Sequence, residues 1–462
     1  MLETIHFYHT NDVHSHFEHW PRTHEFLVTR KKWHKEVGDS CFVLDIGDFM
    51  DRSNVYTEAT LGKGNVKLLN DANYDAVTIG NNEGITLSNS ELNTLYKDAK
   101  FDVLVANLHN INGDVPSWAK SYQIYNTAAG VKVGIIAATA PFYLFYEQLE
   151  WQVLEPLAVL KKQVDELRDQ VDVLVCMSHL GLSEDTLLAE QCPEIDVIFG
   201  AHTHHILHEG KIVNDVLLTG GGKFGLFVGH TEILFDMDLK KVVKKKTMLH
   251  RTIDLASVDK EKEKVVSLEQ RGRELLDVPV FYTDRYYNKE WYHHSNLSRL
   301  FAKALLKFSN ADCALFNAGI FLSGLPKGRV TANDIHGMLP HPINACVVEL
   351  TGECLKEIYM EAQNVDWPRR EVKGLGFRGV VMGKMLNYQF EVDDMGRLVI
   401  GGSIADLKKS YKLVTLDMYT FGYFFPDFKN TPKTYLLPQF LRDILILYGL
   451  EFFKGENSER PD

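Results

Sequence analysis

The sequence predicts an α/β protein with more than one domain, and three observations support this. Short runs of β-branched and aromatic residues alternate with stretches of helical periodicity through the first half of the chain. Several of these runs end in polar residues, as strands that border a site in an open α/β sheet often do. The chain has 462 residues, which is too long for a single hydrophobic core.

The first half is predicted to consist of strands connected by helices. Strands are expected at residues 4–8, 41–46, 76–79, 103–106, 131–137, 171–177 and 195–199. Helices are expected between them at residues 20–37, 64–72 and 156–170. Two more strands, 226–235 and 242–249, would complete this domain. The glycine-rich stretch 220–225 lacks the spacing of a phosphate-binding loop and precedes a strand, so a turn is expected there.

A charged segment separates the two halves. Residues 255–276 are rich in Lys and Glu with apolar residues at helical spacing, which predicts an exposed helix between domains. The second half has its own strands and helices, expected at residues 296–308, 314–316, 331–336, 345–350 and 355–362. The predicted organisation is a first domain at 1–252, a linker helix at 253–278, a second domain at 279–455 and a polar tail at 456–462.

Composition narrows the classes of partner. The net charge of −12 argues against nucleic-acid binding, although a small anionic substrate is compatible with a site whose metal ions supply positive charge. The chain starts without a secretory signal pattern, and no apolar run reaches the roughly 18 residues of a membrane helix. The six cysteines are scattered without CxxC spacing. We therefore expect a reduced, cytoplasmic protein with no membrane partner, and its oligomeric state stays open.

Metal-ligating side chains recur at two-residue spacing. Asp12 and His14 follow the first expected strand, and an extended backbone projects both to one side. His202 and His204 repeat this spacing after the strand 195–199. One such pair is often only a solvated or capping group, so repetition is what favours a metal site. A mixed carboxylate and imidazole set suits Mn²⁺, Fe²⁺ or Zn²⁺ better than Ca²⁺ or Mg²⁺.

Two further side chains extend this pattern. His179 follows the strand 171–177, and Asp48 follows Gly47, where glycine permits a sharp turn. A carboxylate in that position can bridge two cations. Two metal ions roughly 3.5–4 Å apart can activate a water and clamp both sides of an in-line phosphoryl displacement. The sequence therefore favours two divalent metal ions and phosphoester chemistry.

The motifs resemble a known family in their order and spacing. They are Asp12-Val-His14, Gly47-Asp48, Gly80-Asn81, Ser178-His179 and His202-Thr-His204. The chain resembles the calcineurin-like metallophosphoesterases, and more narrowly a cytoplasmic branch of the two-domain bacterial 5′-nucleotidase and UDP-sugar hydrolase family. The resemblance covers the whole chain, more loosely beyond residue 235. It implies a four-layer sandwich of two sheets flanked by helices, followed by a C-terminal α/β substrate-binding domain.

The resemblance also implies a ligand set. One metal would be held by Asp12, His14, Asp48 and His204. The other would be held by Asp48, Asn81, His179 and His202.

The chain departs from the family at the acid–base position. Relatives carry a histidine and an aspartate that stabilise charge on the phosphoryl group and leaving oxygen, where this chain has Asn82 and Ile85. An amide donates hydrogen bonds but transfers no proton at neutral pH. Loss of a general acid typically costs about 10²–10⁴ in rate. Three outcomes are open: compensation by another group, a leaving group that needs no acid, or an inactive enzyme.

Arg52 is the candidate for compensation, with Asn82, as a catalytic residue. A guanidinium close to the bridging Asp48 can hold phosphate oxygens bidentately. The alternative is a surface pair between Asp51 and Arg52. His16, His205 and His208 are also near in sequence, and each is expected to orient a ligand or lie at the surface.

In the second domain, the resemblance implies substrate-binding residues with an eroded nucleotide signature. An aromatic run at 419–425 provides either a stacking platform or core. The substrate-binding candidates are Asn317, Gly319, Asn344, Arg378 and Phe421.

The expected function is two-metal hydrolysis of phosphomonoesters by a metal-activated water, with nucleoside 5′-monophosphates as the expected substrate class. The alternatives are a phosphodiesterase or pyrophosphatase acting on 2′,3′-cyclic nucleotides or UDP-sugars, and hydrolysis of sulfur esters. A metal-binding regulatory protein with little turnover is also open, because Asn82 replaces the family's histidine.

Overall fold

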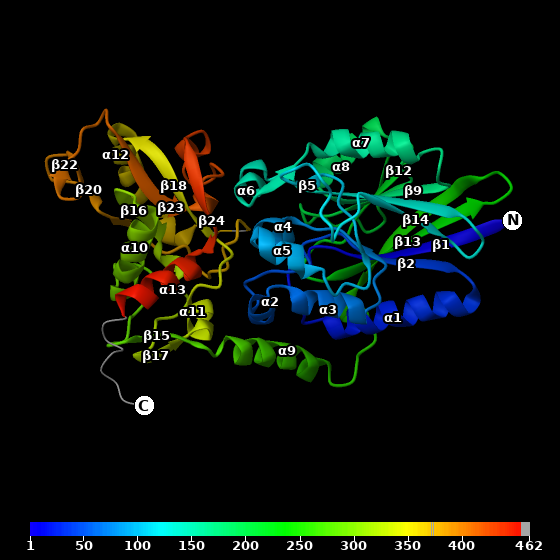
Figure 1. Ribbon diagram of the computed structural model, residues 1–462, viewed down its shortest axis with the longest axis horizontal. Helices are drawn as coiled ribbons and strands as arrows, with labels where there is room; N and C mark the ends of the chain where they lie inside the picture. Colours follow the sequence, from blue (N-terminus) through cyan, green and yellow to red (C-terminus); the bar gives the residue numbers. More distant parts are fainter. Residues whose placement is uncertain (371, 373, 454–462) are drawn as a thin grey trace. The chain divides into compact units, whose positions relative to one another are not determined.

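The computed structural model describes residues 1–370, 372 and 374–453. The chain divides into two compact units, Met1–Gly272 and Arg273 onward, each with its own sheets (Figure 1). The expected polar tail at 456–462 lies outside the described residues. Among the described helices, none is long and apolar enough to cross a membrane.

The first unit contains two six-stranded sheets. The first has the strand order β14-β13-β1-β2-β3-β4, and the second has the order β11-β12-β10-β9-β7-β6. In the first sheet the strands are β1 (Leu2–Thr10), β2 (Ser40–Asp45), β3 (Ala76–Val77), β4 (Asp102–Val103), β13 (Phe227–Asp236) and β14 (Lys241–Arg251). In the second they are β6 (Tyr122–Asn126), β7 (Lys132–Thr139), β9 (Val173–His179), β10 (Val197–Gly200), β11 (Lys211–Val213) and β12 (Val216–Gly220). A small pair, β5 (Leu108–Asn110) and β8 (Trp151–Val153), stands beside them.

The sheets pack face to face around a shared apolar core. Ile5 and Phe7 of β1 belong to the same buried cluster as Val133 of β7 and Val175 of β9. Helices cover the outer faces, with α1 on one side of the sandwich and α7 and α8 on the other (Figure 1). The helices are α1 (Trp20–Val37), α2 (Val55–Thr60), α3 (Lys63–Asp71), α4 (Asn81–Ile85), α5 (Asn89–Leu95), α6 (Tyr143–Gln148), α7 (Pro156–Leu167) and α8 (Leu182–Gln191). The predicted four-layer arrangement is confirmed.

Local sequence explains the bounds of α1. Pro21 occupies the first turn, where its missing N–H costs nothing, and Gly38 adopts the left-handed conformation that ends the helix. The helix buries Trp20, Leu27 and His34. One face of α1 is therefore fixed against the first sheet.

The charged segment predicted as a helix forms α9 (Glu261–Leu276), and the two units divide within it. Arg22 of α1 forms a bidentate pair with Glu261 at 2.7 Å. Gly272 is the buried residue of α9, and a Cβ there would lie 2.6 Å from the Tyr56 backbone nitrogen. The helix therefore packs on the first unit by close backbone approach.

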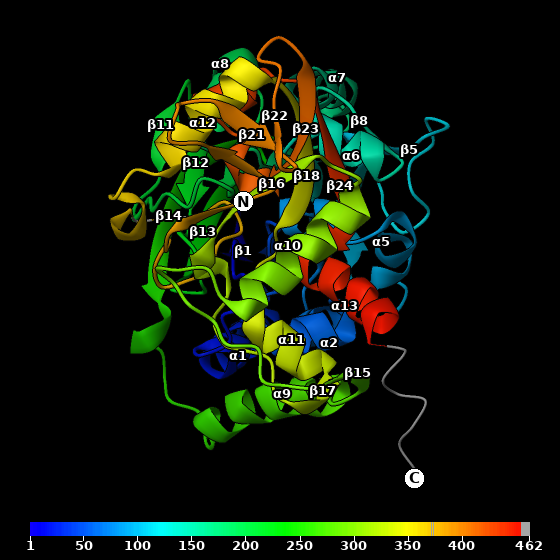
Figure 2. The same ribbon diagram turned by 90° about the vertical axis from the view of Figure 1, so that its left-hand side faces the viewer.

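The second unit is built on a five-stranded sheet with the order β19-β16-β23-β18-β24. Its strands are β16 (Cys313–Asn317), β18 (Asn344–Thr351), β19 (Met385–Tyr388), β23 (Ser410–Leu416) and β24 (Lys433–Phe440). Smaller sheets comprise β15 (Pro279–Thr283) with β17 (Gly328–Thr331), and β20 (Phe390–Val392), β21 (Leu398–Ile400) and β22 (Ser403–Ile404). The helices are α10 (Asn296–Ser309), α11 (Ala332–Met338), α12 (Gly352–Ala362) and α13 (Leu441–Phe452), and α10 lies beside α13 (Figure 2).

Candidate metal centre

The ends of parallel strands bring seven candidate ligands to one edge of the sandwich. Strands β1, β2 and β3 run parallel to one another, as do β9 and β10. Ligands that follow their carboxyl ends therefore converge, although they are far apart in sequence. Asp12 and His14 follow β1, Asp48 follows β2, Asn81 begins α4 after β3, His179 ends β9, and His202 and His204 follow β10.

The backbone at these ligands adopts an uncommon conformation. Five of the seven lie in the left-handed region with φ between 48° and 71°, although none is glycine. Such residues cost of order 1–3 kcal/mol each and persist where the surrounding structure imposes them, often at functional sites. The five are Asp12, His14, Asp48, His202 and His204. This strain has no signature in the sequence.

One group of donors is formed by Asp12, His14 and His204, whose ligand atoms lie within 4.8 Å of one another. The Nε2 atoms of His14 and His204 are 3.2 Å apart. Asp12 Oδ1 lies 3.4 Å from His204 Nε2 and 3.8 Å from His14 Nε2. These separations place three donors around one point, as a single cation requires.

A second group is formed by Asp12, Asp48 and His179, and it shares Asp12 with the first. Asp48 Oδ2 lies 3.5 Å from His179 Nε2 and 3.8 Å from His14 Nε2, so Asp48 also faces both groups. The His202 ring centroid is 5.2 Å from that of His179. The two donor groups are therefore adjacent.

Two buried ligand atoms in this region have no hydrogen-bond partner among the described residues. They are Asn81 Oδ1 and His179 Nε2. The other nitrogen of His179, Nδ1, lies 2.7 Å from the Ile46 carbonyl, to which it can donate. A histidine held in this way offers Nε2 as a lone-pair donor. Both orphaned atoms fit cation binding, because a buried polar atom without a partner is otherwise costly.

The electrostatics of the cluster also favour a cation. Burial lowers the pKa of His179, but the Asp48 carboxylate outweighs it and the net effect raises that pKa to about 10. Burial raises the pKa of Asp48, yet its histidine neighbours bring the net pKa well below the usual range. The carboxylates are thus ionised and attract positive charge. Divalent ions fit this donor set.

Asn82 is buried and its side chain faces the ligands. Its Nδ2 donates to the Met50 carbonyl at 2.9 Å and lies 2.9 Å from His14 Nδ1. Its backbone N–H donates to Asp48 Oδ1 at 2.7 Å. Its Oδ1 accepts from Asn81 Nδ2 at 3.3 Å, so the residue that replaces the family's histidine contacts three ligands.

Arg52 is also buried, at 7% exposure. Its guanidinium donates to both carboxylate oxygens of Glu58 at 2.8 and 3.3 Å, and to the Thr86 carbonyl at 2.7 Å. Asp51 is buried as well, so the two residues do not form a pair at the surface. The structure does not test whether Arg52 binds phosphate.

Sequence reasoning missed Glu83. Its carboxylate accepts from the backbone N–H groups of Asp48 at 3.0 Å, Met50 at 3.0 Å and Gly80 at 2.8 Å. It therefore ties the loop after β2 to the start of α4. Burial, and then the nearby Asp48 charge, raise the pKa of Glu83 to about 7. The signal available was a glutamate three residues after Gly80, at a helix start.

Asn11 was also missed. Its Nδ2 donates to Asp12 Oδ2 and to the Gly222 carbonyl, both at 2.8 Å, and its Oδ1 accepts from the Gly221 N–H. The expected turn at 220–225 thus contacts the ligand loop. Of the other nearby histidines, His16 contacts Phe224, with ring centroids 3.9 Å apart and the rings tilted by 34°.

The substrate-binding candidates of the second unit differ in exposure. Asn317 is fully buried, donating to the Met382 carbonyl and accepting from the Tyr419 hydroxyl, each at 2.7 Å. Asn344 donates to the Gln439 carbonyl, and a Cβ at Gly319 would meet the Val381 carbonyl.

The other two candidates in this unit are less enclosed. Arg378 is half-buried, and its backbone N–H donates to His341. Phe421 is 41% exposed, whereas Tyr419, Phe424 and Phe425 of the same aromatic run are core. Substrate binding by the five candidates stays a prediction.

Comparison with known proteins agrees with this geometry. Residues 5–205 match the family model of calcineurin-like phosphoesterases, and residues 267–422 match that of the 5′-nucleotidase C-terminal domain. The chain is 40% identical over 456 residues to the uncharacterized metallophosphoesterase YunD of Bacillus subtilis (strain 168), covering 96% of this chain and 99% of that one. It is 22% identical over 423 residues to the snake venom 5′-nucleotidase of Naja atra, covering 76% of each.

A solved structure supports the fold. The NAD nucleotidase of Haemophilus influenzae aligns over 99% of this chain and 97% of its own, with a TM-score of 0.65 and 16% identity. Three findings agree: the similarity to a metallophosphoesterase along nearly the whole chain, the two matched domain models, and the converging set of metal donors. The chain therefore belongs to the calcineurin-like metallophosphoesterases that carry a 5′-nucleotidase C-terminal domain, and it is a metal-dependent phosphoester hydrolase.

Proposed function

We propose that this protein hydrolyses phosphomonoesters, with nucleoside 5′-monophosphates as the main substrate class, using two divalent cations. The observation that carries the proposal is the pair of adjacent donor groups sharing Asp12, with Asp48 facing both. The match to the 5′-nucleotidase C-terminal domain and the similarity to venom 5′-nucleotidases support the substrate class. Mn²⁺, Fe²⁺ or Zn²⁺ suits the mixed donors. Location in the cytoplasm stays a prediction.

The candidate ligands would form two cation sites. Asp12, His14 and His204 would hold one ion, with Asp48 extending to it, and Asp48, Asn81, His179 and His202 would hold the other. Divalent cations bound there supply Lewis acidity for a water and for the phosphate oxygens. His179 would bind only with its Nε2 deprotonated, so a cation replaces the proton that the carboxylates otherwise stabilise.

Asn82 would act as a positioning residue. Its amide would fix the ring of His14 while its backbone N–H fixes Asp48. Because an amide supplies no proton, the leaving oxygen would depart without help from this residue. The lack of this proton donor would slow hydrolysis least for substrates whose leaving group is stable as an anion.

This feature favours a second candidate substrate class. In a nucleoside diphosphate or a nucleotide sugar, the leaving group is itself a phosphate, which needs no proton to depart. The absence of a proton donor at Asn82 and of a carboxylate at Ile85 thus favours hydrolysis of phosphoanhydrides on the same site.

The test is a comparison of kcat/KM for AMP, UMP, ADP, UDP-glucose and 2′,3′-cyclic AMP with the Mn²⁺-loaded protein. Fastest turnover of the monophosphates supports the main proposal, and fastest turnover of UDP-glucose or ADP supports the second. Turnover of every substrate no higher than that of Asp48→Ala would refute both and leave a metal-binding regulatory protein.

A further inference from the structure

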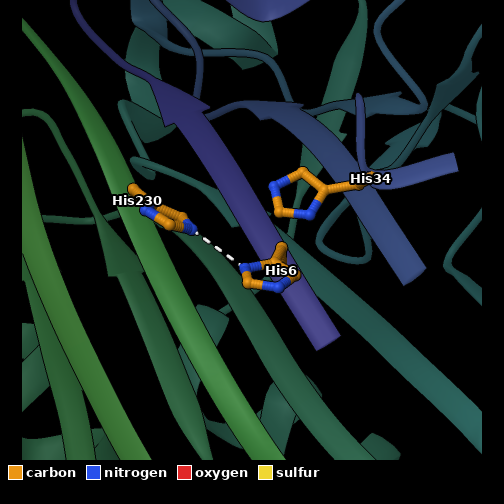
Figure 3. A group of neighbouring side chains, drawn as sticks. All are labelled: His6, His34 and His230. Carbon is orange, nitrogen blue, oxygen red and sulfur yellow. Dashed lines mark hydrogen bonds between the residues drawn. The ribbon is translucent and has the colours of Figure 1, made fainter. Parts of the chain in front are cut away.

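Three buried histidines form a cluster on the outer face of the first sheet, under α1, and the phosphoester site does not use them. They are His6 of β1, His34 of α1 and His230 of β13, exposed by 6%, 1% and 9%. Figure 3 shows the three rings converging between the strands and the helix. We call this group the His6 cluster. Histidines at a helix–sheet interface require explanation, because apolar side chains pack there without buried polar atoms.

The geometry of the His6 cluster suits chelation. One ligand atom from each residue lies within 4.8 Å of the other two. His6 Nδ1 and His230 Nε2 are 3.0 Å apart, drawn as the dashed line in Figure 3. The rings of His6 and His34 have centroids 3.9 Å apart. Four-coordinate Zn²⁺, with bonds of about 2.0–2.1 Å to nitrogen, needs donors about 3.3 Å apart, so small side-chain movements suffice.

A carboxylate faces the opposite side of two of these rings. Asp39 Oδ2 lies 3.6 Å from His6 Nε2 and 3.6 Å from His34 Nδ1. Metal-binding histidines commonly donate their second N–H to a carboxylate, which fixes the tautomer. His34 Nδ1 is buried and has no hydrogen bond within the described part of the chain. Asp39 is thus placed to orient both rings around a cation.

The surroundings supply one further donor and little repulsion. The Tyr8 hydroxyl lies 3.1 Å from His34 Nε2, and its oxygen can serve as the fourth donor beside the three histidine nitrogens. Glu232 Oε1 lies 3.9 Å from His230 Nε2, and the neutral His250 ring stacks 5.8 Å from that of His230. Arg30 is a positive group near His230, and its guanidinium lies over the Phe26 ring, whereas Lys31 and Lys35 line a pocket beside Asp39.

Burial also keeps the histidines neutral. It lowers the pKa of His6 and of His34, and it lowers the pKa of His230 to about 3. Neutral imidazole is the form that binds metal ions, so no proton must be lost from the cluster before binding.

We propose that the His6 cluster is a second metal site, separate from the phosphoester centre, that binds one Zn²⁺ or a similar borderline transition-metal ion. The ligands are His6 Nδ1, His34 Nε2 and His230 Nε2, with Tyr8 as the fourth. The ring that carries the proton between His6 Nδ1 and His230 Nε2 would carry it on its other nitrogen when the ion binds. For His6 that nitrogen is Nε2, which faces Asp39. The bound ion joins β1, β13 and α1, so its role is structural.

The experiment measures Zn²⁺ bound per chain after equilibrium dialysis of the full-length protein, comparing the wild type with His34→Gln and His6→Gln. His24→Gln, a partly exposed histidine of the same helix outside the cluster, is the matched control. The expected result is one equivalent fewer in both cluster variants and no change in the control. Turnover of p-nitrophenyl phosphate should stay within about twofold, since the phosphoester ligands are untouched.

Equal Zn²⁺ stoichiometry in the folded cluster variants and the wild type would overturn the proposal. Should the cluster variants fail to fold, Asp12→Asn/His179→Gln/His204→Gln provides a second measurement, since it removes donors from both groups of the phosphoester centre and leaves the His6 cluster intact. This variant should still bind one Co²⁺ with the visible absorption of tetrahedral nitrogen coordination and should gain thermal stability from Zn²⁺. Absence of both signals would overturn the proposal, whatever the outcome for phosphoester hydrolysis.

Discussion

Replacing Asn82 by alanine separates a role in metal binding from a role at the substrate. The change removes the contact with His14 Nδ1 and the hydrogen bond to the Met50 carbonyl, each at 2.9 Å. It leaves the backbone N–H that donates to Asp48 in place. It also removes the oxygen that accepts from Asn81 Nδ2 at 3.3 Å, so the perturbation affects the orientation of two ligands and one buried carbonyl.

Both consequences have an expected size. Loss of a group that orients a metal ligand typically costs 10- to 100-fold in metal affinity, or about 1.4–2.7 kcal/mol. Met50 is buried at 1% exposure, so its unpaired carbonyl should lower the unfolding free energy of the metal-free protein by about 1–3 kcal/mol. Isothermal titration with Mn²⁺ measures the first quantity, and urea unfolding after chelation measures the second.

Asn112→Ala is the control, because Asn112 is exposed and contacts only its own turn among the bonds described. It should leave both quantities unchanged. If Asn82→Ala binds Mn²⁺ like the wild type while kcat falls 100-fold or more, Asn82 acts on the substrate and the positioning role is refuted.

Three further predictions concern the surrounding structure. Glu83→Gln keeps one oxygen for the N–H groups of Asp48 and Gly80 but turns an NH₂ group toward the Met50 N–H, which loses its acceptor. The unfolding free energy measured in urea should therefore fall by about 1–3 kcal/mol, and an unchanged value would contradict the loop-tying role. Burial raises the pKa of Asp417 to about 7, above its unfolded value, so the native state retains a proton that the unfolded state loses. The stabilising contribution of Asp417 should therefore be complete below about pH 4 and decrease by about 1.4 kcal/mol per pH unit up to about pH 7. Asp417→Asn should remove this component from the pH dependence of unfolding, and the same pH dependence in both proteins would refute the assignment. Gly272→Ala would place a Cβ 2.6 Å from the Tyr56 nitrogen, which should lower the free energy of unfolding by about 1–3 kcal/mol. Helix α9 should then be cleaved faster in limited proteolysis, and resistance equal to that of the wild type would argue against close packing.

The sequence predicted the architecture better than the contacts within the site. Alternating strand and helix patterns placed β1, β2 and β9 within a few residues, because hydrophobic periodicity reports burial directly. The ligands were recognisable because they follow those strands at short, repeated spacings. The left-handed backbone at Asp12 and Asp48 has no such pattern, since it is imposed by the folded loops.

Contacts between distant segments were not predictable. Arg52 was expected at phosphate or in a surface pair with Asp51, and the pairing of its buried guanidinium with Glu58, six residues further along the chain, was not foreseen. The Asn317 candidate was chosen by motif, and only the packed unit reveals that Tyr419 and Met382 satisfy its amide. The His6 cluster joins residues 224 positions apart, which no local pattern indicates.

The central claim is that the converging donors form a working phosphoesterase centre despite the loss of the acid–base histidine. The most direct test is the turnover of p-nitrophenyl phosphate by the Mn²⁺-loaded protein, measured beside Asp48→Asn at equal metal concentration. Because p-nitrophenolate departs without a proton, the wild type should turn over at least 100-fold faster than the variant. Equal rates in the two proteins would contradict the claim.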